Sequence, residues 1–437
     1  MFFAAPACLW LMGCGGSVPE LLPVGAAPSG SGTVTAGASP VLPVLPPPVE
    51  VPVNSPLIST WSRTWEGGLA QMPDGTASVS GMTVRQFMHT SIGGDTVEIT
   101  FSNVLGAQPL VISASHLALR DTKAAIVAGT DHALTFGGAG SVTVAAGAVV
   151  VSDPLTMTVQ PFADLAVTTF FGSTPVVMTG NPYPIATSYV VAGNEMGSVD
   201  LGTAGAMVDT YYLAAADVSS ASPAVQTTVV GFGDSVVDGN RSTIDGNHRW
   251  LDVLAQRLAG TGKGVANAGI VGNRLLHGAE EPVIFYGDSG VSRFGRDALA
   301  VPAVQDIIVS IGLNDIGATE NGAAPQSEKV TADDLIAGYT TLIQQAHAKN
   351  VRVLGATLTP IAGFYGFTSA DETTRQTINV WLRSGKSGYD GVIDFDAVVR
   401  DPAKPAQLAS QYDSGDGIHP NDAGYAVMAG AIDLSTL

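Results

Sequence analysis

The sequence predicts an α/β fold in which a three-layer α/β/α domain, with a parallel sheet of about five strands, follows an antiparallel β-sandwich domain. Three observations lead to this prediction. Alternating apolar and polar runs fill the first half, strands alternate with helices in the second half, and polar residues directly follow the second set of strands. At 437 residues the chain is too long for one ordinary domain, and 46% hydrophobic residues can fill two cores.

The first 56 residues are expected to lie outside both cores. Residues 1–14 form an apolar run too short to span a bilayer, and its end at Gly13-Cys14 resembles a bacterial lipobox, in which Cys14 would carry a lipid. No Lys or Arg precedes Arg63, so the positively charged region that usually begins a signal peptide is missing. Ordinary secretion and an incidental apolar N-terminus are therefore alternatives to a lipoprotein. Residues 15–56 read as a Pro/Gly/Ser-rich linker. We expect a secreted or cell-envelope-anchored protein, and the lipobox favours a bacterial lipoprotein.

Residues 57–222 carry the alternating runs that predict the β-sandwich. In Thr96–Ser102 every second residue is apolar, as in a half-buried strand, and residues 141–144 and 155–159 repeat the pattern. Glycine-rich turns such as residues 137–140 separate the runs, which is typical of an antiparallel sandwich. This domain would either bind carbohydrate or shield one side of a site on the next domain.

Residues 223–437 change to strand–helix alternation. The apolar run Thr228–Phe232 predicts the first strand, and Arg249–Leu258 follows with apolar residues at helical spacing. A second helix is expected at 335–348, and the further strands are expected at residues 265–268, 307–311, 351–356 and 391–395. Such alternation implies parallel strands with helical crossovers.

Polar residues near these strand ends form a candidate catalytic set. Ser235 follows the first strand, and a serine hydroxyl needs a base within hydrogen-bond reach to act as a nucleophile. His419 is the candidate base, and Asp416, three residues earlier, would orient its ring. Donors for a developing oxyanion would be the N–H groups of Ser235 and Gly272 and the side-chain amide of Asn314.

Several neighbouring residues have competing interpretations. Asp413 and Asp422 are alternatives to Asp416 as the acid, although they lack its spacing to the histidine. Asp234 and Asp315 are expected to brace loops through backbone hydrogen bonds. A separate pair, His248 and His277, is expected to flank the mouth of the site as solvated residues.

Charge and cysteine content exclude other classes of chemistry. The formal net charge of −19 argues against a nucleic-acid partner. Both cysteines, Cys8 and Cys14, lie near the N-terminus, so the nucleophile must be an oxygen and no internal disulfide is expected. The remaining histidines show no metal-ligand spacing, and we expect neither a metal nor an organic cofactor. The oligomeric state stays open.

Four blocks of residues, in order, resemble those of the SGNH (GDSL-type) hydrolases. They are Gly-Asp-Ser at 233–235, the segment 267–273 with Gly272, Gly-Leu-Asn-Asp at 312–315, and Asp-Gly-Ile-His-Pro at 416–420. The resemblance covers about residues 225–437 and implies a flavodoxin-like sheet. It also implies a triad of Ser235, His419 and Asp416, with Gly272 and Asn314 in the oxyanion hole. Val237 departs from the first block, where threonine is usual.

The resemblance implies a serine esterase. Residues 247–250 and 267–276 look like a bacterial subfamily of acylhydrolases with members linked to xylan breakdown. The expected substrate is therefore a short-chain ester, acetyl in particular, on a small molecule or a polysaccharide. Alternatives are a lipase-like acylhydrolase or an acyltransferase and, from another class, a non-catalytic carbohydrate-binding surface lipoprotein.

Overall fold

The computed structural model describes residues 57–62, 68–69, 78–183, 185–202, 204–207, 209–220, 226–280 and 284–437. These residues belong to one compact unit, 53–437. The lipobox segment with Cys14 and the linker 15–56 lie outside the described residues, so both stay predictions. Among the residues described, no helix is long and apolar enough to cross a membrane.

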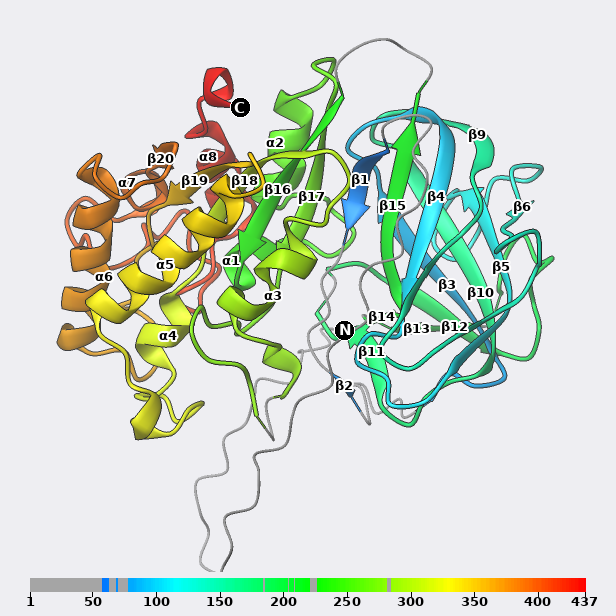
Figure 1. The fold of residues 1–437 in the computed structure, drawn as a ribbon, viewed down its shortest axis with the longest axis horizontal. Coiled ribbons are helices and arrows are strands. Elements are labelled where there is room, and N and C mark those ends of the chain that lie inside the picture. The colour runs from blue at the N-terminus through cyan, green and yellow to red at the C-terminus, as the bar shows by residue number, and fades with distance from the viewer. Residues whose placement is uncertain are drawn as a thin grey trace, which may run out of the picture. The chain divides into compact units, whose positions relative to one another are not determined.

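The first part of this unit, here called the β-rich part, consists of antiparallel sheets (Figure 1). One sheet has the order β1 (Ile58–Ser62), β15 (Leu213–Ser219), β4 (Gly94–Ser102), β8 (Val149–Val151), with β9 (Leu155–Val159) also on β4. The second has the order β13 (Gly205–Met207), β12 (Ser188–Ala192), β3 (Met82–His89), β10 (Asp164–Ser173), β5 (Leu110–Leu119), β6 (His132–Ala133), with β7 (Val142–Val144) also on β5. A third, short sheet has the order β14 (Thr210–Tyr211), β11 (Met178–Asn181), β2 (Gly68–Leu69).

Side-chain alternation explains how the two larger sheets share a core. In β4 the apolar residues of the alternating run, Val97 and Phe101 among them, are fully buried, and β10 contributes Leu165 and Val167 to the same cluster. Successive side chains of a strand point to opposite faces, so this pattern places one face of each sheet inward. The predicted antiparallel sandwich is confirmed.

The second part, here called the α/β part, contains a parallel sheet of five strands with helices on both faces (Figure 1). The strand order is β17 (Lys263–Gly269), β16 (Thr227–Gly233), β18 (Val304–Ser310), β19 (Arg352–Ala356), β20 (Gly391–Ile393). The helices are α1 (Ser235–Asp238), α2 (Trp250–Arg257), α3 (Gly290–Asp297), α4 (Leu313–Gly317), α5 (Ala332–His347), α6 (Ser369–Arg383), α7 (Phe395–Val399) and α8 (Asp422–Gly430). Single 3₁₀ turns lie at Ile284–Tyr286, Gln326–Glu328 and Leu434–Thr436.

Local sequence explains these elements. Thr331 caps α5 in a capping box with Asp334, which is why this helix begins three residues before the predicted start at 335. In α2 the buried residues Trp250, Leu251 and Leu254 recur at helical spacing and face the core. The predicted three-layer α/β/α fold is confirmed.

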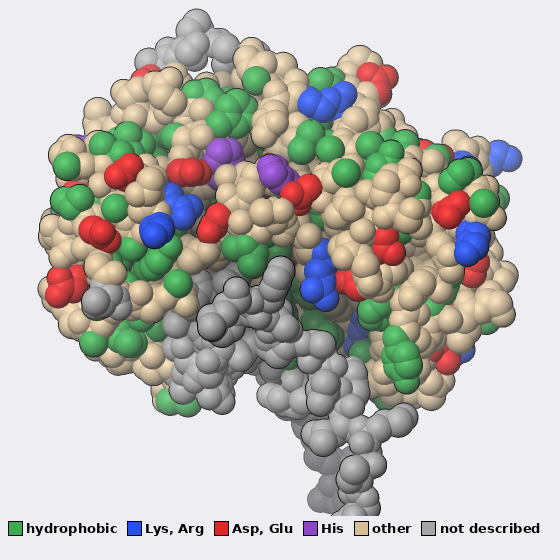
Figure 2. Space-filling model, turned by 180° about the vertical axis from the view of Figure 1, so that it is seen from behind, with side chains coloured by type: hydrophobic (Ala, Val, Ile, Leu, Met, Phe, Trp, Pro, Cys, Tyr) green, Lys and Arg blue, Asp and Glu red, His purple; other side chains and the backbone are tan. Residues whose placement is uncertain are grey.

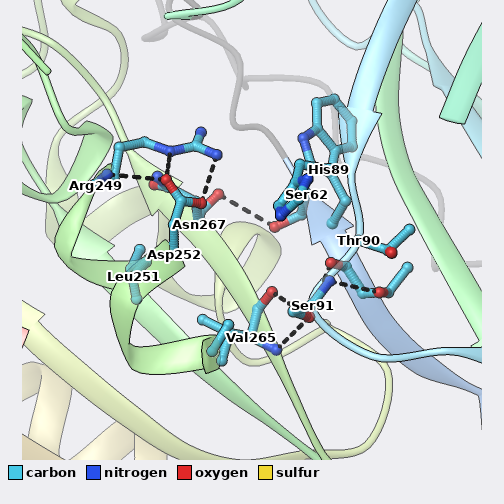
Figure 3. Close-up of a pocket in the computed structure, with 12 residues that line it drawn as sticks. Ser62, His89, Thr90, Ser91, Arg249, Leu251, Asp252, Val265 and Asn267 are labelled. Carbon is cyan, nitrogen blue, oxygen red and sulfur yellow. Dashed lines mark hydrogen bonds and ion pairs between the residues drawn. The ribbon is translucent and has the colours of Figure 1, made fainter. Parts of the chain in front are cut away.

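The β-rich part covers an edge of the parallel sheet. Strand β17 is the edge strand, and Figure 3 shows side chains of the β-rich part meeting its backbone. Ser62 Oγ donates to the Asn267 carbonyl (3.2 Å), and Ser91 Oγ both donates to the Val265 carbonyl (3.2 Å) and accepts from the Val265 N–H (2.8 Å). An uncovered edge would leave such groups without protein partners, so these contacts satisfy part of the sheet edge. The division into separate folding domains near residue 222 stays a prediction.

Candidate active site

The candidate site lies where β16 and its two neighbouring strands end. β16 runs parallel to β17 and β18, and Gly233 is in register with both Gly269 and Ser310. A Cβ at position 233 would overlap the Ser310 carbonyl oxygen, so only glycine lets the strands approach this closely. The loops that follow these strands therefore emerge side by side, as expected for a parallel sheet.

Ser235 is the first residue of α1, directly after β16. Asp234 is the N-cap of this helix, and its side chain accepts the N–H of Val236 at 3.0 Å. The cap starts the helical turn at the serine and leaves its side chain directed at the C-terminal segment 416–419. Ser235 is only 5% exposed, so most of its surface is already withdrawn from water.

His419 and Asp416 complete a hydrogen-bonded series with Ser235. His419 Nε2 lies 2.8 Å from Ser235 Oγ, and His419 Nδ1 lies 2.8 Å from Asp416 Oδ2. Asp416 Oδ1 also accepts the N–H groups of Ile418 (3.1 Å) and His419 (2.9 Å). Burial opposes ionisation of Asp416, but the hydrogen bond and charge of His419 outweigh it and hold the pKa of Asp416 well below its usual range. An ionised Asp416 places the Nδ1 proton towards itself and leaves Nε2 to accept from the serine.

The two competing carboxylates have other partners. Asp413 Oδ1 accepts the N–H groups of Gly415 (2.8 Å) and Gly417 (3.1 Å), so it shapes the turn before the histidine. Asp422 lies 2.6 Å from Nδ1 of His248 instead of contacting His419. The structure therefore brings Asp416, and neither competitor, to His419.

Gly272 lies in the turn after β17 with a φ of +74°, in the left-handed region that favours glycine. A Cβ there would run into the ring of Tyr286, which packs against this turn. Asn273, the next residue, donates from Nδ2 to the Tyr286 carbonyl (2.7 Å) and the Asp288 carbonyl (2.8 Å). These contacts hold the turn that carries the Gly272 N–H.

Asn314 lies in α4, just after β18. Its Nδ2 donates to the Asn273 carbonyl at 3.0 Å, which links the loops after β17 and β18. An amide nitrogen carries two hydrogens, so this bond orients the group while the other N–H can meet a ligand. The structure thus joins Asn314 to the loop that carries Gly272, and their role as oxyanion donors stays a prediction.

Two buried carboxylates brace these loops, as predicted. Asp234 caps α1, and Asp315 accepts the N–H groups of Leu275 (2.6 Å) and Leu276 (2.9 Å). Burial raises the pKa of Asp234 to about 7 and the pKa of Asp315 to about 6, against the opposing effect of their backbone hydrogen bonds.

These raised pKa values predict how stability depends on pH. A carboxyl whose pKa is raised by folding contributes stability that is fully present below the unfolded pKa of about 3.9 and is lost as pH rises through the folded pKa. Asp416 has the opposite sign, so its contribution is lost only below about 3.9. We therefore expect the Tm measured by calorimetry to fall as pH rises from 5 to 8, because Asp234 and Asp315 ionise in the folded protein over this range.

The control for this prediction is Asp234→Asn, because an asparagine oxygen can still accept the Val236 N–H. The drop in Tm from pH 5 to pH 8 should be smaller in this variant than in the wild type. Equal drops in both proteins would contradict the assignment of a raised pKa to Asp234.

Arg293 is a supporting residue that the sequence did not reveal. It is buried in α3 and donates to the carbonyls of Gly233 (2.7 Å) and Ala268 (3.0 Å) and to Asn273 Oδ1 (2.9 Å). Its guanidinium also lies over the Phe232 ring, 4.1 Å from the ring centre. One side chain therefore holds the ends of β16 and β17 and the Gly272 turn together. A local signal that could have pointed to it is Asp297, four residues later, whose Oδ2 lies 3.3 Å from Arg293 Nη1.

The flanking histidines lie outside the hydrogen-bonded series. His248 is exposed and pairs with Asp422, and His277 is half-buried. Figure 2 shows histidine side chains at the surface of one face, with acidic side chains beside them. Across the described ranges, no group of three or more His, Cys, Asp or Glu side chains could hold a metal ion.

Fold and site together define an α/β protein with a serine, a histidine and an aspartate in hydrogen-bonded series at the carboxyl edge of its sheet. Residues 232–427 match the GDSL-like lipase/acylhydrolase family. The resemblance seen in the four sequence blocks is confirmed.

Several solved structures are similar to the chain. A lipolytic G-D-S-L family protein from Veillonella parvula is 18% identical, with 47% of this chain and 95% of that chain covered and a TM-score of 0.35. An α/β hydrolase from the metagenome of Lake Arreo is 19% identical, with coverages of 49% and 96% and a TM-score of 0.37. An acetyl xylan esterase is 19% identical, with coverages of 47% and 96% and a TM-score of 0.34. A comparison with curated proteins gave no match.

Proposed function

We propose that this protein is a serine esterase that hydrolyses short-chain carboxylic esters, acetyl esters above all. The observation that carries the proposal is the unbroken series from Ser235 Oγ through the His419 ring to Asp416, with 2.8 Å at each step. Such a series activates a hydroxyl that is otherwise a weak nucleophile.

In the proposed mechanism Ser235 Oγ attacks the ester carbonyl carbon while His419 Nε2 takes the hydroxyl proton. Asp416 stabilises the imidazolium, and the carbonyl oxygen becomes an oxyanion. The N–H groups of Ser235 and Gly272 and Nδ2 of Asn314 would donate to it. The bond to the alcohol then breaks as His419 returns the proton to the leaving oxygen. Water, deprotonated by His419, releases the acid from Ser235 in the second half.

A small apolar cavity beside the site supports a short acyl group. It has a volume of about 10 Å³ and lies between Asn314, the oxyanion donor, and Ile418, the neighbour of the histidine. The remaining lining residues are mainly apolar: Leu313, Gly317, Asn321, Ile361, Phe364, Tyr365 and Phe367. A cavity of roughly 10–15 Å³ holds about one water molecule, and a methyl group is of similar size. An acetyl methyl would fill this cavity, whereas the further carbons of a longer chain would have to lie outside it.

This cavity gives a prediction about chain length. On a series of p-nitrophenyl esters from acetate to decanoate, kcat/KM should be highest for acetate and fall steeply beyond butyrate. Phe367→Ala removes part of the cavity wall and makes room for a longer acyl chain. We therefore expect the ratio of kcat/KM for hexanoate to kcat/KM for acetate to rise about tenfold or more, which is the effect of one or two additional methylene groups in a pocket.

Tyr365→Ala is the matched control, since Tyr365 is 75% exposed and lines the same cavity from its rim. This variant should keep the wild-type profile. A wild-type preference for long chains would contradict the short-chain proposal and favour a lipase-like acylhydrolase.

The polysaccharide substrate and the lipid on Cys14 are part of this proposal and rest on the sequence. Acetate release from acetylated xylan, compared with p-nitrophenyl acetate and with Ser235→Ala as the blank, tests the first. No release from the polymer by an enzyme active on the small ester would exclude it. The mass of the mature N-terminus tests the second.

A further inference from the structure

The loop between α1 and α2, residues 239–249, connects the β-rich part with the acid of the serine–histidine–aspartate series. Within it Arg241, Asp245 and Asn247 have φ angles of +70°, +60° and +51°. Non-glycine residues persist in this left-handed region when the surrounding structure holds them there. The contacts on either side of the loop show what holds it.

On one side the loop is anchored to the start of α8. Thr243 donates both its N–H (2.8 Å) and its hydroxyl (2.7 Å) to the Asp422 carboxylate. His248 Nδ1 lies 2.6 Å from the same carboxylate. Asp422 comes three residues after His419, so these contacts tie the loop to the segment that carries both the acid and the base.

On the other side the loop is anchored to the β-rich part. The Asp245 carboxylate accepts the N–H (2.8 Å) and the hydroxyl (2.7 Å) of Thr187, and the Asp245 N–H donates to the Ile185 carbonyl at 3.1 Å. Arg120 Nη1, also from the β-rich part, lies 3.9 Å from Asp245 Oδ1. Three hydrogen bonds and an ion pair therefore cross between the two parts at a single residue.

Two residues before Thr243, Arg241 reaches the catalytic acid of the proposed mechanism. Its Nε donates at 3.0 Å to Asp416 Oδ2, the same oxygen that His419 Nδ1 meets at 2.8 Å. The other Asp416 oxygen takes backbone N–H groups from its own segment, so Arg241 is a donor that reaches the carboxylate from a different loop. The Arg241 side chain is 54% exposed, so water screens its charge and its main effect is on the orientation of the carboxylate.

We propose that Arg241 is a positioning residue for Asp416, and that the β-rich part sets its place through Thr187 and Asp245. The inference rests on the proposed function, because Arg241 can position Asp416 for catalysis only if the protein is an esterase. The β-rich part would then contribute to turnover without touching the substrate. Because Arg241 contacts Asp416 rather than Ser235 or the oxyanion donors, its loss should lower kcat and leave KM unchanged.

The first experiment measures steady-state hydrolysis of p-nitrophenyl acetate by Arg241→Gln, with active sites counted by titration with a serine-reactive phosphonate. We expect kcat per titrated site to fall about tenfold with KM unchanged, because small misplacement of a catalytic group costs rate. Arg241→Lys, which keeps a cationic donor, should recover part of the loss. A purely structural role would lower Tm and the titratable fraction instead, so an unchanged kcat per site would overturn the proposal.

The second experiment tests the connection to the β-rich part with Asp245→Gly. Glycine suits the φ of +60° at this position, so the variant removes the carboxylate contacts without adding backbone strain. We expect kcat per site to fall, and the double variant Arg241→Gln/Asp245→Gly to be no slower than Arg241→Gln alone, because both act through one path. Losses that multiply in the double variant would overturn the connection.

Ser91→Ala is the matched control for this second experiment. Ser91 also joins the two parts, but it contacts Val265 on β17 and lies away from the loop. This variant should keep the wild-type kcat per site. A loss as large as that of Asp245→Gly would mean that any weakened contact between the parts slows the enzyme, and it would overturn the specific connection through Asp245.

Failure of the positioning role is distinguishable from failure of the proposed function. Hydrolysis that disappears in Ser235→Ala but is complete in Arg241→Gln would overturn the positioning role alone. A wild-type protein without esterase activity, or a fully active Ser235→Ala, would overturn both.

Discussion

We expect Ser235→Ala to lower kcat for p-nitrophenyl acetate by roughly 10⁶-fold, the loss typical of removing the nucleophile of such a series. Without the hydroxyl, His419 has no oxygen to deprotonate and no acyl-enzyme can form. Steady-state assays at saturating ester would measure the loss, and the wild type should also show a burst of nitrophenol that the variant lacks. A variant within tenfold of the wild type would contradict a serine mechanism.

The matched control is Ser242→Ala. Ser242 is as buried as Ser235, at 5% exposure for each, and its hydroxyl donates to the Gly239 carbonyl at 2.8 Å. Its loss should cost about 1 kcal/mol of stability, as for an ordinary hydrogen bond, and leave kcat within a few-fold of the wild type. The two variants together separate loss of the nucleophile from loss of a buried hydroxyl.

The second large effect is expected for Asn314→Ala. This change removes the side-chain donor of the proposed oxyanion hole, and loss of one such donor costs roughly 10²–10³ in kcat. The charge on the carbonyl oxygen develops in the transition state, so KM should change little. The variant also loses the bond to the Asn273 carbonyl, and a thermal melt would show whether the loop is disturbed.

Asn321→Ala is the matched control for this second prediction. Asn321 lines the same cavity as Asn314, but its side chain accepts the N–H of Ala323 at 3.0 Å within its own loop. Its replacement should leave kcat within a few-fold of the wild type. Comparable losses in both asparagine variants would indicate a disturbed cavity wall rather than a missing oxyanion donor.

Much of the fold could be predicted because its signals are local. The alternation in Thr96–Ser102 and the apolar spacing in α2 depend on neighbouring residues, and the structure has a strand and a helix at these places. The strand is more buried than predicted, because Glu98 and Ser102 on its other face are buried too. Strand β3 was missed for a physical reason. It carries a fully buried arginine, Arg85, whose charge is met by Thr168 Oγ1 and by backbone carbonyls such as that of Ser198. Such a strand is buried on both faces and shows no simple alternation.

The candidate site likewise contains residues that could be predicted from the sequence and residues that could not. Ser235, Asp416 and His419 could be named because their residue types and order carry chemical meaning, and the structure brings them into one hydrogen-bonded series. Arg293 and Arg241 could not be named in this way. Each meets backbone or carboxylate groups far away along the chain, and an arginine in a loop or an amphipathic helix has no distinctive local pattern.

The sequence by itself determined the class of architecture, the family that residues 232–427 match and the candidates for nucleophile, base and acid, since each of these depends on residue type, order and short-range spacing. Only the tertiary structure decided which carboxylate meets His419, which loops form the walls around Ser235, and how the β-rich part reaches Asp416 through Thr187, Asp245 and Arg241. The physical reason is that these contacts join segments separated by tens to hundreds of residues, and their geometry exists only once the sheets have packed.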